Sequence, residues 1–90
     1  MNSILSEKDT QAVYDILVEQ IGIHREQISL DARIMEDLGA DSLTVMEIVM
    51  AVEDRFSLSI PDEELEKVST VGDLLELLAM LLIKTGPKLN

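Results

Sequence analysis

Apolar residues recur at helical spacing along most of this 90-residue chain, and this periodicity restricts the fold more than any other feature. In the clearest stretch they fall on one face of a helix: Val45, Ile48, Val49, Val52 and Phe56. Similar stripes run through residues 13–21 and 71–81, and no stretch alternates as a strand does. The sequence therefore predicts an all-α fold, a small up-down bundle of three long helices and one short helix.

Capping residues indicate where these helices begin and end. Ser6, Asp41 and Thr70 are typical N-cap residues, and Pro61 favours a helix start just after it. The predicted C-terminal stops are Gly22, Gly86 and Pro87. The expected helices span about residues 7–21, 42–56, 62–68 and 71–84, in a single domain that covers residues 1–90.

The connection between the first two predicted helices is long, from Gly22 to about Asp41. Its apolar residues are too irregularly spaced for a long helix: Ile28, Leu30, Ile34, Met35 and Leu38. We expect them to pin this first loop across the bundle, with one short helical turn in it. A loop of this length inside a compact domain is usually functional.

The chain is strongly acidic, with a formal net charge of −11. Between Glu36 and Glu66, ten carboxylates stand against the single base Arg55. This charge excludes ordinary nucleic-acid binding and stable binding to anionic membranes, and it favours partner proteins with basic surfaces. The chain has no cysteine, so any thiol chemistry requires an added group. The apolar stretch 74–83 is too short to span a membrane and no secretory signal is visible, so we expect a cytoplasmic monomer.

The helix predicted over residues 42–56 carries a second apolar stripe, away from its core face. This stripe consists of Leu43, Met46 and Met50, and its neighbours are acidic: Glu47, Glu53 and Asp54. One buried face is all that a single core needs. Apolar side chains ringed by carboxylates fit an apolar socket with a basic rim, so the second stripe predicts a docking face for partner proteins.

Ser42 is the candidate for chemical modification. If Asp41 caps the helix, the Ser42 hydroxyl is not needed for capping and faces solvent at the first helical position. A phosphate ester on that hydroxyl would lie at the positive end of the helix dipole, near unpaired N–H groups. Gly39 lets the backbone turn just before this position. The position is therefore suited to carrying a phosphate ester, although Asp-Ser at a helix start is also common in purely structural contexts.

The stretch Glu36-Asp37-Leu38-Gly39-Ala40-Asp41-Ser42-Leu43 resembles the phosphopantetheine attachment motif of acyl carrier proteins, most of all the free-standing bacterial type. The resemblance continues in the family's order through residues 47–56, 60–64 and 68–74. It implies that holo-acyl-carrier-protein synthase, a magnesium-dependent transferase, attaches phosphopantetheine from coenzyme A to Ser42. It also implies that Asp41 helps to position this transferase and its metal, and that the docking face binds acyl-processing enzymes. The protein would then be a non-catalytic carrier of acyl groups as thioesters in fatty acid biosynthesis.

The resemblance also implies an acyl pocket within the bundle. Its expected lining is Val49, Val52, Phe56, Ile60, Leu65, Val68, Leu74 and Leu75, all of which are also ordinary core positions. Three features depart from the family. They are Thr44 in place of a further acid, Arg55 within an acidic run, and the apolar Leu77, Met80 and Ile83 outside the main stripe of the last helix. These departures leave open a specialised carrier for a polyketide, an aminoacyl group or another lipid, with its own synthase.

Two other function classes fit the sequence less well. A hydrolase with Ser42 as nucleophile needs a base, and the only histidine, His24, lies in the first loop; the nucleophile-elbow pattern is also missing. The acids Asp62, Glu63, Glu64 and Glu66 cluster near a helix start but lack the spacing of an EF-hand loop. We therefore expect no dedicated metal site.

Overall fold

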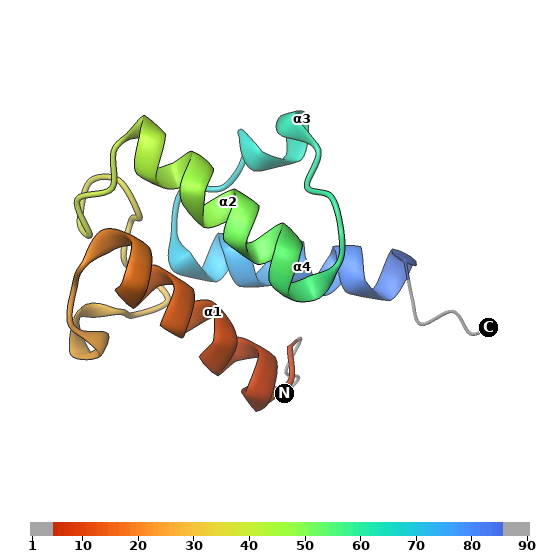
Figure 1. Ribbon diagram of the computed structural model, residues 1–90, viewed down its shortest axis with the longest axis horizontal. Coiled ribbons are helices and arrows are strands. Elements are labelled where there is room, and N and C mark those ends of the chain that lie inside the picture. Colours follow the sequence, from red (N-terminus) through yellow and green to blue (C-terminus); the bar gives the residue numbers. More distant parts are fainter. Residues whose placement is uncertain (1–4, 86–90) are drawn as a thin grey trace.

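Four α-helices make up most of residues 5–85, the part of the chain that the computed structural model describes (Figure 1). They are α1 (Glu7–Ile21), α2 (Ser42–Phe56), α3 (Asp62–Leu65) and α4 (Val71–Thr85), with a 3₁₀ turn, η1, at Arg25–Gln27. No strand occurs in these residues, and their single isolated β-bridge joins Arg33 to Thr70. The predicted all-α bundle with three long helices and one short one is confirmed.

The predicted caps are present at the helix ends. The Ser6 hydroxyl accepts a hydrogen bond from the Asp9 N–H at 3.1 Å. Gly22 ends α1 in the left-handed conformation, with φ of 83°. At α4 the Thr70 hydroxyl accepts from the Asp73 N–H at 3.0 Å, and the Asp73 carboxylate accepts from the Thr70 N–H at 3.1 Å. Each bond satisfies an N–H that the helix leaves unpaired, which is why these residues set the boundaries.

The third helix is shorter than predicted. It ends at Leu65 rather than at residue 68, because the chain then closes with tighter bonds between residues three apart. The N–H of Lys67 donates to the Glu64 carbonyl at 3.1 Å, and the N–H of Val68 donates to the Leu65 carbonyl at 2.9 Å. The predicted stops Gly86 and Pro87 lie outside the described residues.

The core is aliphatic and lies between the three long helices (Figure 1). α1 packs against α2 and runs in the opposite direction, and α4 crosses behind them. The largest fully buried side chains come from α1, α2 and α4: Val13, Leu17, Val52, Val71, Leu74 and Leu78. No charged or polar side chain is buried among the described residues, so hydrophobic burial is the main stabilising term.

Backbone hydrogen bonds hold the first loop against the segment that leads into α4. The N–H of Ile34 donates to the Ser69 carbonyl at 3.0 Å, and the Val71 N–H donates to the Ala32 carbonyl at 2.9 Å. At Gly72 a Cβ would lie 3.1 Å from the Leu30 carbonyl oxygen, so a residue without a side chain suits this close approach. These bonds fix the loop across one end of the bundle.

The predicted role of the loop's apolar residues is correct for some and wrong for two. Ile34 and Leu38 are buried and Ile28 is half-buried, whereas Leu30 and Met35 are 56% and 50% exposed. Leu30 lies in a turn that the Ala32 N–H closes onto the Ser29 carbonyl, so its side chain faces outward. Met35 lies in a turn that the Asp37 N–H closes onto the Arg33 carbonyl at 2.8 Å, so its side chain is not enclosed by the core. The predicted short helical turn is η1.

Candidate functional site

Ser42 is the first residue of α2, and its side chain is exposed. The cap is supplied by its neighbour: the Asp41 carboxylate accepts a hydrogen bond from the Thr44 N–H at 2.9 Å. That N–H is the main cause that holds the pKa of Asp41 below its ordinary value, so Asp41 is charged at neutral pH. As predicted, Asp41 is the N-cap, which leaves the Ser42 hydroxyl at the positive end of the helix without a capping role.

The segment just before Ser42 is held in a defined shape. Gly39 has φ of 85°, a conformation that costs a residue with a side chain about 1–2 kcal/mol. The N–H of the next residue, Ala40, donates to the Ile34 carbonyl at 3.2 Å, and the Ala40 side chain is buried. The Asp37 carboxylate accepts from the Arg33 N–H at 2.8 Å, which is the main cause that lowers the pKa of Asp37. The approach to Ser42 is therefore anchored at both the glycine turn and the loop.

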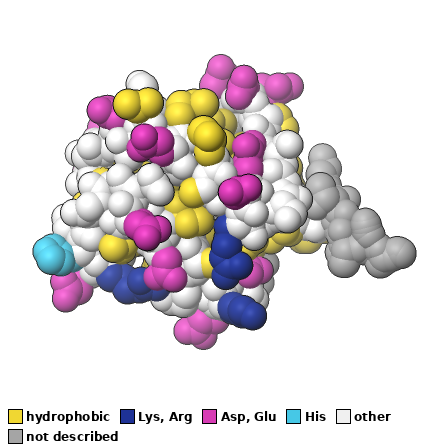
Figure 2. Space-filling model, viewed as in Figure 1, with side chains coloured by type: hydrophobic (Ala, Val, Ile, Leu, Met, Phe, Trp, Pro, Cys, Tyr) yellow, Lys and Arg dark blue, Asp and Glu magenta, His cyan; other side chains and the backbone are white. Residues whose placement is uncertain are grey.

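The predicted docking face is exposed along α2. Leu43, Met46 and Met50 are 68%, 50% and 64% exposed. Figure 2 shows hydrophobic side chains gathered over α2 with acidic side chains beside them, while Lys and Arg lie lower in the view. Glu47 and Asp54 are exposed as well.

Glu53 also stabilises the fold, a role that its position in the sequence does not predict. It is half-buried, and its carboxylate accepts a hydrogen bond from the Ile60 N–H at 2.8 Å. This bond ties the loop after α2 to the helix. Glu53 therefore stabilises the fold at the far end of the docking face, and less of its charge is available to a partner than that of Glu47 or Asp54.

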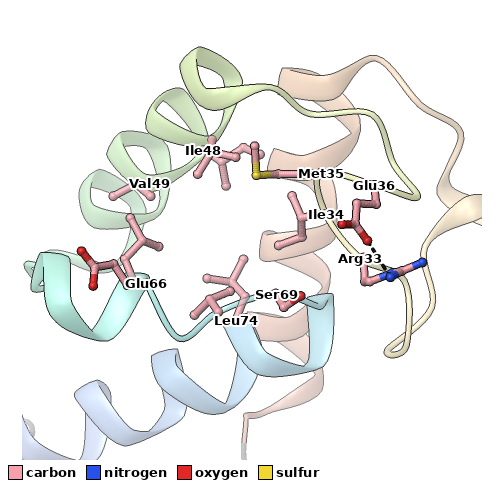
Figure 3. A pocket seen from close by; sticks show the side chains of 12 residues that line it. Arg33, Ile34, Met35, Glu36, Ile48, Val49, Glu66, Ser69 and Leu74 are labelled. Carbon is pink, nitrogen blue, oxygen red and sulfur yellow. Dashed lines mark ion pairs between the residues drawn. The ribbon is translucent and has the colours of Figure 1, made fainter.

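A cavity of about 300 Å³ lies between α2, the first loop and the segment from α3 to the start of α4 (Figure 3). Its apolar lining comes from all these segments: Ile34, Met35, Val45, Ile48, Val49, Leu65, Val68 and Leu74. Four polar residues complete it: Arg33, Glu36, Glu66 and Ser69. Arg33 and Glu36 form an ion pair at 2.6 Å at one side, and both side chains are exposed to solvent, at 54% and 67% (Figure 3). The interior is therefore mainly apolar.

The cavity adjoins the end of α2 that carries Ser42. Val45 lies one turn further along the helix, a rise of about 4.5 Å from Ser42. Of the predicted pocket residues, four line this cavity: Val49, Leu65, Val68 and Leu74. The other four lie outside it: Val52, Phe56, Ile60 and Leu75. Val52 and Phe56 are further turns away from Ser42 along α2, and Val52 is fully buried in the core.

The competing functions would use His24 or a cluster of acidic side chains. His24 is exposed at the start of η1, and its backbone N–H donates to the Gln27 side chain at 2.9 Å. It is the surface side chain drawn in cyan in Figure 2. Within residues 5–85, no three His, Cys, Asp or Glu side chains gather in a way that could hold a metal ion. None of the helices described here has the length and apolar character needed to cross a membrane.

Comparison with known proteins agrees with this geometry. The family profile described as "Phosphopantetheine attachment site" matches residues 11–78, which include Ser42. The acyl carrier protein of Wolinella succinogenes is 48% identical over 62 residues, which are 69% of this chain and 82% of that protein. This chain belongs to the acyl carrier protein family. Another family member, from Clostridium acetobutylicum, is 47% identical over 64 residues, covering 71% of this chain and 83% of that one.

The fold agrees with the family as well. The solved structure of the acyl carrier protein from Enterococcus faecalis superposes with a TM-score of 0.71 and 36% sequence identity, covering 83% of this chain and 95% of that one. The residues at the start of α2 also fit the prosthetic group of acyl carrier proteins. An exposed hydroxyl at a helix N-terminus whose cap is already supplied can carry a phosphodiester, and the apolar cavity one turn away suits an apolar cargo.

Proposed function

We propose that this protein carries acyl groups as thioesters on a phosphopantetheine arm attached to Ser42. The observation that supports this most is the position of Ser42: an exposed hydroxyl, relieved of capping by Asp41, at the end of α2 beside an apolar cavity. In this account the protein is not an enzyme but the substrate of a phosphopantetheinyl transferase. It delivers intermediates to the enzymes of fatty acid biosynthesis.

The start of α2 is suited to the attachment reaction. The positive end of the helix stabilises the negative phosphodiester on Ser42. The ionised carboxylate of Asp41 would repel the phosphodiester. The same negative charge can attract the divalent cation that such a transferase uses, and this cation offsets the repulsion. We therefore assign Asp41 two roles: it caps α2, and it positions the transferase and its metal.

The cavity is the proposed site for the acyl chain. Burial of an alkyl chain contributes about 0.8 kcal/mol per methylene, which favours entry of the chain into an apolar cavity over exposure to water. The first loop forms part of this pocket through Ile34 and Met35, in addition to the helices. Because Arg33 and Glu36 pair with each other and most of the other lining residues are apolar, the lining supports an apolar cargo over a polar one. This favours a fatty acyl group over an aminoacyl group.

The exposed face of α2 is the proposed docking site for partner enzymes. Leu43, Met46 and Met50 would enter an apolar socket, and Glu47 and Asp54 would meet basic residues at its rim. Glu53 contributes less because its carboxylate is bound to the Ile60 N–H. Electrostatic complementarity of this kind mainly raises the association rate.

We further propose that the chain is one domain that works as a cytoplasmic monomer without stable membrane binding. The net charge of −11 supports this, because it opposes the approach of a second copy and of anionic lipid. The alternative is a specialised carrier for a polyketide, an aminoacyl group or another lipid with its own synthase, and the observations behind it are Thr44 and the apolar fourth helix.

The acyl load on the protein purified from its own host tests this function. Intact-protein mass spectrometry should show the phosphopantetheine adduct together with a series of acyl additions. Neutral hydroxylamine should remove the acyl additions, since it cleaves thioesters, and should leave the arm in place. The masses released identify the pathway. A protein from growing cells that carries no adduct, or acyl groups that resist hydroxylamine, would contradict the proposal.

A further inference from the structure

A second groove, which shares only Val68 with the proposed acyl cavity, lies between residues 64–68 and residues 73–80 of α4. Its volume is about 220 Å³, and its apolar surface comes from Val68, Leu77 and Met80. Leu77 is buried at 7% exposure and forms the floor, whereas Met80 is 41% exposed at one side. The groove is on a different part of the bundle from the exposed apolar face of α2.

The apolar surface extends beyond the groove along α4. Glu76, Met80 and Ile83 are four and three residues apart, so they form one stripe on the helix surface. Ile83 is 76% exposed. Single exposed apolar side chains are ordinary on a protein surface. Here Ile83 extends the apolar surface of the groove beyond Met80, and Glu76 forms the polar end of the stripe.

The polar rim of this groove is acidic. Its charged residues are Glu64, Asp73 and Glu76 against Lys67 alone. Lys67 pairs with Glu64 at 3.8 Å, and the Asp73 carboxylate accepts hydrogen bonds from the backbone at the start of α4. Glu76 is exposed, and within the described side chains no hydrogen bond or ion pair engages it. One carboxylate beside the apolar floor is therefore available to a basic group.

We infer that the α3–α4 groove is a second docking surface, for a partner-protein segment that places an apolar side chain next to an Arg or Lys. The apolar side chain fills the groove over Leu77 and beside Met80, and the cation pairs with Glu76. The acidic rim favours this occupant over a second copy of the chain and over an anionic membrane surface. A second copy of this chain would bring two acidic rims together, and an anionic membrane surface would be repelled in the same way. Docking here needs no phosphopantetheine arm, so this inference can be tested independently of the proposed function of Ser42.

The variants that test this surface must leave the acyl cavity intact. Val68 lines both sites and is unsuitable, but Met80 and Glu76 line only the groove. The test variants are Met80→Ser and Glu76→Gln. The matched controls on the α2 face are Met50→Ser and Glu47→Gln, which make the same chemical changes at positions that are also exposed.

The probe is a synthetic amphipathic helical peptide with a Leu face flanked by Arg, titrated into the full-length ¹⁵N-labelled protein and followed by amide chemical shifts. We expect saturable shifts at residues 64–68 and 73–80. Met80→Ser should raise the Kd for this site about tenfold, and Glu76→Gln about threefold, whereas the two α2 variants should leave it unchanged.

Five results would overturn the inference. The shifts could be confined to α2, or Met50→Ser could weaken the α3–α4 shifts as much as Met80→Ser does. The same peptide with Glu in place of Arg could bind equally well, which would remove the role of charge. Finally, phosphatidylglycerol vesicles, or a rise in protein concentration alone, could produce the α3–α4 shifts, which would assign the groove to a membrane or to a second copy.

Discussion

One additional methylene group on α2 should stabilise the protein at Val49 and destabilise it one turn later at Val52. Val49 lines the 300 Å³ cavity, so the larger side chain of Val49→Leu can enter space that is already open. Val52 is fully buried and does not line this cavity, so we expect Val52→Leu to displace its neighbours. Both changes occur within the same helix and alter helix propensity equally, so their difference reports packing alone.

The magnitudes follow from the two environments. Burial of one methylene contributes at most about 0.8 kcal/mol, so Val49→Leu should raise the free energy of unfolding by about 0.5–0.8 kcal/mol. For a domain of this size this corresponds to a Tm increase of about 2–6 °C. Overpacking at Val52 should lower the free energy of unfolding by about 1–3 kcal/mol. Urea denaturation followed by circular dichroism measures both values.

The acylated forms of the same variants test whether the acyl chain occupies the cavity beside Val49. An octanoyl group on the arm should stabilise the wild type, because its chain fills the cavity. Val49→Leu should reduce this gain, since its side chain occupies part of the same space, and Val52→Leu should retain it. If Val49→Leu destabilises the protein as much as Val52→Leu does, the space beside Val49 is closed in solution. The proposed location of the acyl chain would then be wrong.

Three further outcomes are expected. Gly39→Ala should lower the free energy of unfolding by about 1–2 kcal/mol in urea denaturation, because φ at this position is 85°; an unchanged value would contradict the turn before Ser42. The N–H groups of Thr70 and then Ser69 hold the pKa of Asp73 below its ordinary value, so its charged form adds stability at neutral pH. The difference in unfolding free energy between wild type and Asp73→Asn should therefore be largest above about pH 4 and should decrease as the pH falls through the lowered pKa of Asp73. A difference that does not change with pH would refute this. Glu47→Lys should raise the KM of holo-acyl-carrier-protein synthase for this protein several-fold at low salt and much less at high salt, whereas a salt-independent effect would argue against charge in docking.

The parts of the structure that sequence predicted correctly are set by neighbouring residues. Asp41 caps α2 through an N–H only three residues away, and Thr70 and Asp73 bind each other across the same spacing. The exposed stripe on α2 follows from helix geometry alone. For this reason the start of α2, with Ser42 at its first position, could be identified without a structure.

The parts that sequence did not predict depend on contacts between distant segments. Ile34 lines the 300 Å³ cavity because its N–H binds the Ser69 carbonyl, a pairing across 35 residues that leaves no local pattern. Glu53 is engaged by the N–H of Ile60, which makes it partly structural although its sequence context resembles that of Asp54. Helical periodicity identifies which face of α2 is buried, but it does not show which buried residues adjoin open space. Half of the predicted pocket residues lie outside the cavity for that reason.

The central claim is that Ser42 is the attachment point of the arm. Intact-protein and peptide mass spectrometry after incubation with coenzyme A, magnesium and a phosphopantetheinyl transferase tests it most directly. Wild type should gain one phosphopantetheinyl group on the peptide that contains Ser42, as should the control Ser57→Ala, which changes an exposed serine at the other end of α2. Ser42→Ala should gain none while retaining its helical circular dichroism spectrum. Modification of a folded Ser42→Ala, or an unmodified wild type with several transferases, would contradict the account.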